Sequence, residues 1–106
     1  MRRDETMTTS ALQIRAIVRM QPASSLPVVK PLTAGWGPVI YFQDKYYAGR
    51  VLECELPIEP GKAGEALIGI MASVDSMGLQ EGAVFELGDG PTTLIATATV
   101  LSCTAI

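Results

Sequence analysis

Apolar and polar side chains alternate along several short segments of this chain, and this period of two limits the possible folds most strongly. Between Leu12 and Met20 the even positions hold only apolar residues, whereas Arg15 and Arg19 occupy odd positions. Thr92–Ser102 alternates in the same way, with leucine, alanine and valine at the even positions from Leu94 to Val100. Such alternation is typical of β-strands that turn one face toward a core.

Prolines and glycines separate the alternating segments. Pro22, Pro27 and Pro31 lie within ten residues and exclude a helix there, so Gln21–Gly37 is predicted to be a long extended loop. The remaining β-branched and aromatic runs predict further strands at Val39–Gln43, Tyr46–Leu56 and Ala83–Leu87, with turns at Asp44-Lys45, Met77–Gly82 and Gly88–Pro91.

One segment fits two secondary structures. In Glu65–Val74, apolar residues recur at the helical spacing i, i+3, i+4, i+7, beginning at Leu67, but the even positions also alternate as in a strand. Gly64 and Gly69 each lower helix propensity by about 1 kcal/mol. The local pattern therefore leaves helix and strand both open.

Length and hydropathy predict one domain. The chain has 106 residues, of which 48% are hydrophobic, enough for a single core. Residues 1–10 are polar and unpatterned, so we expect a flexible tail before a domain spanning residues 11–106. The longest apolar run, Ala66–Ala72, is too short to cross a membrane, and no apolar stretch follows the first residues as in a secretory signal. We therefore expect a cytoplasmic protein without membrane contact.

Charge and residue usage disfavour several function classes. The net charge is −3, which disfavours DNA and other non-specific nucleic-acid binding because phosphates need lysine and arginine. The chain has no histidine, GxSxG or CxxC, so we expect no catalysis, cofactor or metal. Cys54 and Cys103 are expected to be small apolar residues at the core or its rim. The acidic residues, including Glu53, Glu55 and Asp75, are interpreted as solvated strand faces.

The order of short motifs resembles one known domain. Gly35–Phe42 is similar to a Gly-Tyr-Arg-Pro-x-Phe-Tyr-Phe segment, and Ala48–Val51 to a strand that starts with Thr-Gly. Leu79–Phe85 is similar to a Leu-Glu-Glu-Gly-x-x-Phe motif, and Gly88–Gly90 to a closing hairpin. Together these motifs resemble the C-terminal β-barrel domain of elongation factor Tu and related translation GTPases.

The resemblance implies an all-β fold, a six-stranded antiparallel closed β-barrel, in which Glu65–Val74 is a strand. No GxxxxGK[ST] motif is present, so we expect a stand-alone barrel without the GTPase domain. In the family this barrel holds the TΨC stem of aminoacyl-tRNA through basic residues. The matching positions here are the uncharged Leu26–Val29, Gly37 and the acidic Asp75, so we expect no tRNA binding.

Five of the six aromatic residues lie within twelve positions, from Trp36 to Tyr47. Tyr41 and Phe42 are expected to fill the barrel, whereas Trp36, Tyr46 and Tyr47 flank a loop and a turn and are predicted to bind a partner. The sequence thus predicts a non-catalytic protein-binding module, with an unknown protein or a second copy as partner. A translation- or RNA-linked accessory protein and, with less support, an enzyme or metal-binding protein are the alternatives.

Overall fold

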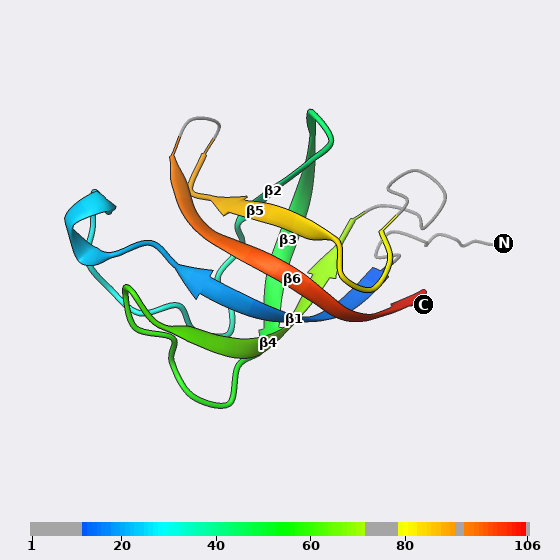
Figure 1. Cartoon of the computed structure of the whole chain (residues 1–106), viewed down its shortest axis with the longest axis horizontal. Helices are drawn as coiled ribbons and strands as arrows, with labels where there is room; N and C mark the ends of the chain where they lie inside the picture. Colours follow the sequence, from blue (N-terminus) through cyan, green and yellow to red (C-terminus); the bar gives the residue numbers. More distant parts are fainter. Residues whose placement is uncertain (1–11, 72–78, 91–92, 106) are drawn as a thin grey trace, which may run out of the picture.

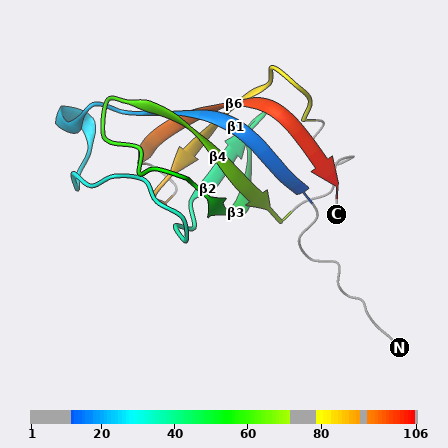
Figure 2. The same cartoon turned by 90° about the horizontal axis from the view of Figure 1, so that it is seen from below.

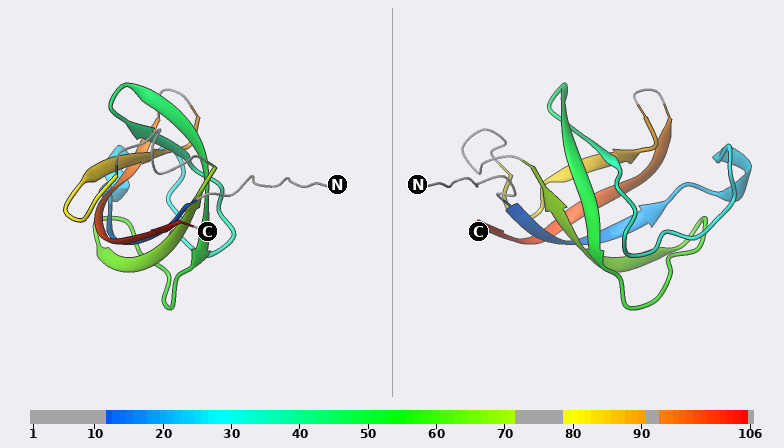
Figure 3. Two further views of the ribbon diagram at one scale, coloured as in Figure 1. Left: turned by 90° about the vertical axis from the view of Figure 1, so that its right-hand side faces the viewer. Right: turned by 180° about the vertical axis from the view of Figure 1, so that it is seen from behind.

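A closed, antiparallel β-barrel is the architecture of the computed structural model, which describes residues 12–71, 79–90 and 93–105. Its six strands are arranged around the ring in the order β1-β4-β3-β2-β5-β6 (Figure 1, and Figure 3, left). The strands are β1 (Leu12–Met20), β2 (Val39–Phe42), β3 (Lys45–Glu53), β4 (Ala63–Ile70), β5 (Val84–Gly88) and β6 (Leu94–Ala105). The predicted fold class, an all-β closed six-stranded barrel, is confirmed.

Strand β1 closes the ring, because it pairs with β4 on one side and with β6 on the other (Figure 2). Its even-numbered side chains are buried in the barrel, whereas Arg15 and Arg19 are exposed on the outside. The alternation in the sequence therefore predicted both the strand and the face that it buries. The β1–β6 register shifts between Arg15 and Ala16, which marks a bulge in an otherwise regular ladder.

The barrel interior is filled by aliphatic side chains and one phenylalanine, and no polar or charged side chain is buried among the described residues. The fully buried residues of largest volume come from all six strands and include Leu12, Ile14, Ile40, Val51, Ile68, Ile70, Phe85, Leu87 and Val100. A barrel of this size leaves room inside for side chains only.

The segment with two possible structures is a strand. Ala66, Ile68 and Ile70 of β4 are buried, and β4 pairs with both β1 and β3. Pairing on both sides satisfies the backbone of this glycine-containing segment, so the tertiary context overrides its helical spacing. Residues 72–78, which include the end of the predicted segment and part of the predicted Met77–Gly82 turn, lie outside the described residues, as does the predicted tail at residues 1–10.

The predicted loop Gln21–Gly37 is extended apart from one 3₁₀ turn, η2 (Ala23–Ser25). It crosses one end of the barrel and is fixed there by backbone hydrogen bonds. Leu32 and Ile58 each donate a backbone N–H to the other's carbonyl, at 2.9 and 3.0 Å. Gly35 N–H donates to Val51 O at 2.8 Å, and Val51 N–H donates to Trp36 O at 2.7 Å. The end of the loop, at Gly35 and Trp36, therefore lies beside β3 and is hydrogen-bonded to Val51.

Several predicted strand boundaries differ from the structure by one to three residues, and two of the differences lie at the ends of β3. The turn between β2 and β3 consists of Gln43 and Asp44, both with positive φ (52° and 64°), so Lys45 already pairs with Phe42 as the first residue of β3. These angles are those of a type I′ hairpin turn, which suits the twist of the strands but usually contains asparagine and glycine. Strand β3 ends at Glu53 rather than at Leu56, and its register with β4 shifts between Val51 and Glu53, so that Val51 is buried and Glu53 is exposed.

We predict that Asp44→Gly stabilises the protein, because glycine adopts positive φ without the steric cost that other residues incur. The free energy of unfolding should rise by about 1 kcal/mol in urea denaturation. The matched control is Lys45→Gly, one position along in β3, which should lower that free energy. Equal effects of the two substitutions would contradict the turn assignment.

Candidate functional site: the β2–β3 wall and the loop pocket

Tyr46 lies on the outside of the barrel, on the strand that crosses in front of the others in Figure 3 (right). Its side chain is 66% exposed. Tyr41 of β2 pairs with Tyr46 across the hairpin, and the two rings meet edge to face with centroids 5.0 Å apart. This geometry is favourable for aromatic pairs, so each tyrosine orients the other at the surface.

Apolar side chains extend this surface along β3. Val39 pairs with Ala48 on the same outer face, and Met71 follows β4 with its N–H donated to Ala48 O at 2.9 Å. Leu52 lies over Gly69, where an added Cβ would come within 3.1 Å of a Leu52 methyl carbon. We name this surface the β2–β3 wall and define it as Val39, Tyr41, Tyr46, Ala48, Leu52 and Met71.

The outer face of β1 shows how unusual the wall is. Outward positions of β1 hold Gln13, Arg15, Ile17 and Arg19, three polar residues and one apolar residue, as expected for a strand in contact with water. Beyond the hairpin end, β3 carries two exposed charged residues: Arg50, whose Nη1 donates to Gly35 O at 3.2 Å, and Glu53 at the far end of the strand, after the register shift. The barrel exterior is therefore mostly polar over β1 and mostly apolar over β2 and β3.

Tyr41 is held in place from two sides. Its hydroxyl donates a hydrogen bond to the carbonyl of Gly90, and its ring covers Gly88, where an added Cβ would lie 2.6 Å from the Tyr41 Cε2. Gly88 is therefore the residue that lets the ring approach β5 this closely. Partial burial raises the pKa of the Tyr41 hydroxyl, and the neighbouring Tyr46 and Glu86 raise it further.

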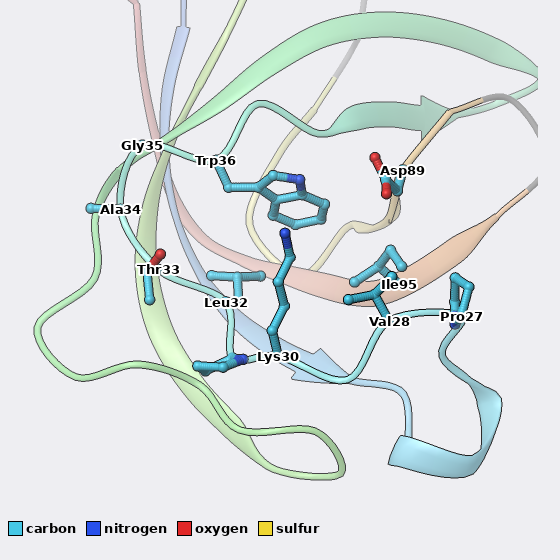
Figure 4. A pocket seen from close by; sticks show the side chains of 11 residues that line it. Pro27, Val28, Lys30, Leu32, Thr33, Ala34, Gly35, Trp36, Asp89 and Ile95 are labelled. Carbon is cyan, nitrogen blue, oxygen red and sulfur yellow. The ribbon is translucent and has the colours of Figure 1, made fainter.

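Trp36 lies in a different place, in a pocket between the long loop and the β5–β6 connection (Figure 4). The pocket has a volume of about 440 Å³. Most of its lining residues are apolar, but backbone and polar side-chain atoms make up about half of its surface, and Lys30 and Asp89 are the only ionisable residues among the described ones that line it. The Trp36 side chain is half-buried and packs against the barrel core, while Lys30 points toward its indole ring. We name this site the loop pocket and define it by the side chains of Val28, Lys30, Leu32, Trp36, Asp89 and Ile95.

The three predicted partner-binding residues therefore occupy three environments. Tyr47 is half-buried and packs against the core, on the opposite face of β3 from Tyr46. The carbonyl of Trp36 accepts a hydrogen bond from the N–H of Val51. Val51 lies five residues along β3 from Tyr46, which at 3.3 Å per residue places the two strand positions about 16 Å apart. The structure brings Tyr46 together with Tyr41, and it brings Trp36 together with Lys30.

Acidic side chains and Cys54 line a second pocket of about 550 Å³, together with Arg15. Arg15 lies between Glu65, at 3.0 Å, and Glu53, at 4.0 Å, and all three are well exposed. No group of three or more potential metal ligands occurs among the described residues, and Asp75 lies outside them. Cys54 and Cys103 are free and half-buried at the rim of the core, and burial raises the pKa of both thiols. A raised pKa lowers their thiolate fraction and hence their reactivity.

Sequence reasoning missed Lys30 and Asp89, because the loop that places Lys30 beside Trp36 has no periodicity. It also missed Leu52 and Met71 as surface residues. Their signal was present, since the outward positions of β3 from Tyr46 to Leu52 hold three apolar residues and one charge, but the face that β3 buries was needed to recognise it.

Comparison with known proteins gives no family for this chain, so its function is argued from its own residues. No family model matches the sequence, and no curated protein is significantly similar to it. Within the described ranges, no helix has the length and apolarity required to span a membrane.

We predict that Tyr41 ionises above its ordinary pKa of 10.0. The difference between ultraviolet titrations of the wild type and Tyr41→Phe gives the Tyr41 curve, and its midpoint should lie above 10. The folded state holds the Tyr41 proton more tightly than the unfolded state does. Protonated Tyr41 therefore contributes to the free energy of unfolding at pH values below its pKa in the unfolded state, and this contribution is lost as the pH rises through its pKa in the folded state. Stability should therefore fall above pH 10, less steeply in Tyr41→Phe. A midpoint at or below 10 would contradict this environment.

Proposed function

We propose that this chain is a non-catalytic protein-binding module built on a barrel like the C-terminal domain of elongation factor Tu. The ordered motifs are the basis of the family part of this proposal, and a closed six-stranded barrel is the fold that they imply. The proposed contact surface is the β2–β3 wall, with Tyr46 at its centre.

The observation that carries the proposal is the exposure of large apolar side chains on the wall. Tyr46, Leu52 and Met71 are 66%, 38% and 49% exposed, although outward positions of a barrel in water are usually polar. Large apolar side chains exposed on one face are typical of protein interaction sites, even with Arg50 between Ala48 and Leu52, and tyrosine is enriched among the residues that dominate binding energy. The wall is also rigid, because it is built on paired strands, so little order is lost on binding.

The placement of positive charge supports a protein partner rather than RNA. The described cations are spread over β1, the long loop, the hairpin, β3 and the turn before β4: Arg15, Arg19, Lys30, Lys45, Arg50 and Lys62. Arg15 is paired with two glutamates. A nucleic-acid surface usually gathers such residues on one face. An RNA-linked accessory role therefore has less support than protein binding.

The test is affinity capture from a lysate of the native host, with and without ribonuclease, followed by mass spectrometry. A protein partner should survive ribonuclease, and Tyr46→Ala should weaken its capture about tenfold or more, as expected for loss of a central anchor. Sedimentation velocity of the purified protein, with the same variants, tests a second copy as partner.

Leu52→Ser and Leu101→Ser form a matched pair for this experiment. The two leucines are 38% and 39% exposed, but Leu101 lies on β6, on the opposite side of the ring from β3. Only Leu52→Ser should weaken binding. Capture that depends on RNA, or that Leu101→Ser weakens as much as Leu52→Ser, would contradict the proposed contact surface.

A further inference from the structure

The loop pocket carries a second inference, independent of the β2–β3 wall. We propose that it binds a small zwitterion with an apolar side chain, either a free amino acid or a short peptide. The ligand's carboxylate would pair with Lys30, its ammonium group with Asp89, and its apolar side chain would pack against Trp36.

Size and lining fit such a ligand. A volume of about 440 Å³ lies within the range of small-molecule sites, which are mostly apolar with a few polar groups that fix orientation. Leu32, Trp36 and Ile95 supply an apolar surface that is already packed against the core or buried in it. An aliphatic or aromatic side chain would therefore be removed from water on contact with this surface.

The charges define the ligand more closely. Lys30 and Asp89 both line the pocket, and Figure 4 shows the Lys30 amino group pointing toward the Trp36 indole. Neither residue has an ion-pair partner in the described part of the chain, where Arg15 forms the only salt bridges. Two opposite, unpaired charges beside one apolar surface complement a ligand that carries both charges. A phosphate compound fits less well, because it would meet a single cation and a carboxylate.

The pocket is formed before any ligand arrives. Pro27 and Pro31 restrict the loop backbone, and the paired hydrogen bonds of Leu32 with Ile58 fix its middle. Trp36 is tied to β3 through Val51, and Asp89 N–H donates to Thr93 O at 2.9 Å across the β5–β6 connection. A ligand therefore meets walls that are already held in place, which reduces the ordering cost of binding.

Trp36 also supplies the readout, because it is the only tryptophan in the chain. We would titrate the purified protein with L-leucine and with the dipeptide Leu-Leu, neither of which absorbs where tryptophan does. At least one should change the Trp36 fluorescence saturably at concentrations up to about 10 mM, as expected for a ligand of this size. Which of the two binds more tightly distinguishes a free amino acid from a short peptide.

Two variants and two ligand analogues test the charge assignments. The C-terminal amide of the tighter ligand lacks the carboxylate, and its N-acetyl form lacks the ammonium group. Wild-type protein should bind each analogue about fivefold more weakly, as for an exposed ion pair. Lys30→Met should abolish the preference for carboxylate over amide, and Asp89→Asn the preference for free over acetylated amine.

Lys45→Met, on the β2–β3 hairpin, is the control and should keep both preferences. Circular dichroism of each variant checks that the barrel is retained. Absence of any saturable change with both ligands would overturn the proposal. Saturable binding in which the amide and acetyl analogues equal the parent ligand, or in which Lys30→Met keeps the carboxylate preference, would overturn the assigned roles of the two charges.

Discussion

Closure of the barrel through β1 is the constraint on which the rest of this structure depends. Because β1 pairs with β4 and with β6, the sheet has no free edge, and the backbone of every strand can be hydrogen-bonded on both sides. Closure also creates a single inside and a single outside. One set of alternating side chains must fill the interior, and the other set is left to face water or a partner.

The two proposed sites follow from that division. The β2–β3 wall is an outer face on which alternation places apolar residues, so its exposure is a consequence of closure rather than of a local distortion. The loop pocket arises where the long loop crosses the end of the barrel and is hydrogen-bonded to β3 and to Ile58. One site is thus built on strands and the other on a loop that the strands hold in place, and the two can act separately.

The predictability of the structure from sequence differs between its parts for physical reasons. The alternation in Leu12–Met20 predicted a strand and its buried face, because burial of one face is what that pattern requires. The pattern of Glu65–Val74 left helix and strand open, since the pairing of β4 with β1 and β3 is a long-range interaction. The hairpin turn lies one residue earlier than predicted, because Gln43 and Asp44 adopt positive φ without the usual glycine.

The candidate site was predictable only in part. Local composition singled out Trp36, Tyr46 and Tyr47, but adjacent residues of a strand face opposite sides, and Trp36 lies far along β3 from Tyr46. The meeting of Lys30, Trp36 and Asp89 joins positions up to 59 residues apart through the closure of the barrel. A pattern within one short segment of the sequence cannot predict that residues so far apart line the same pocket.

Amide hydrogen exchange in β1, followed by nuclear magnetic resonance, tests barrel closure most directly. In a closed ring the N–H groups of β1 point alternately toward β4 and β6, so both sets are hydrogen-bonded. The structure predicts slow exchange for successive residues from Gln13 to Met20, apart from the bulge at Arg15 and Ala16. Fast exchange at every second residue would show that β1 is an edge strand and would contradict the closed barrel.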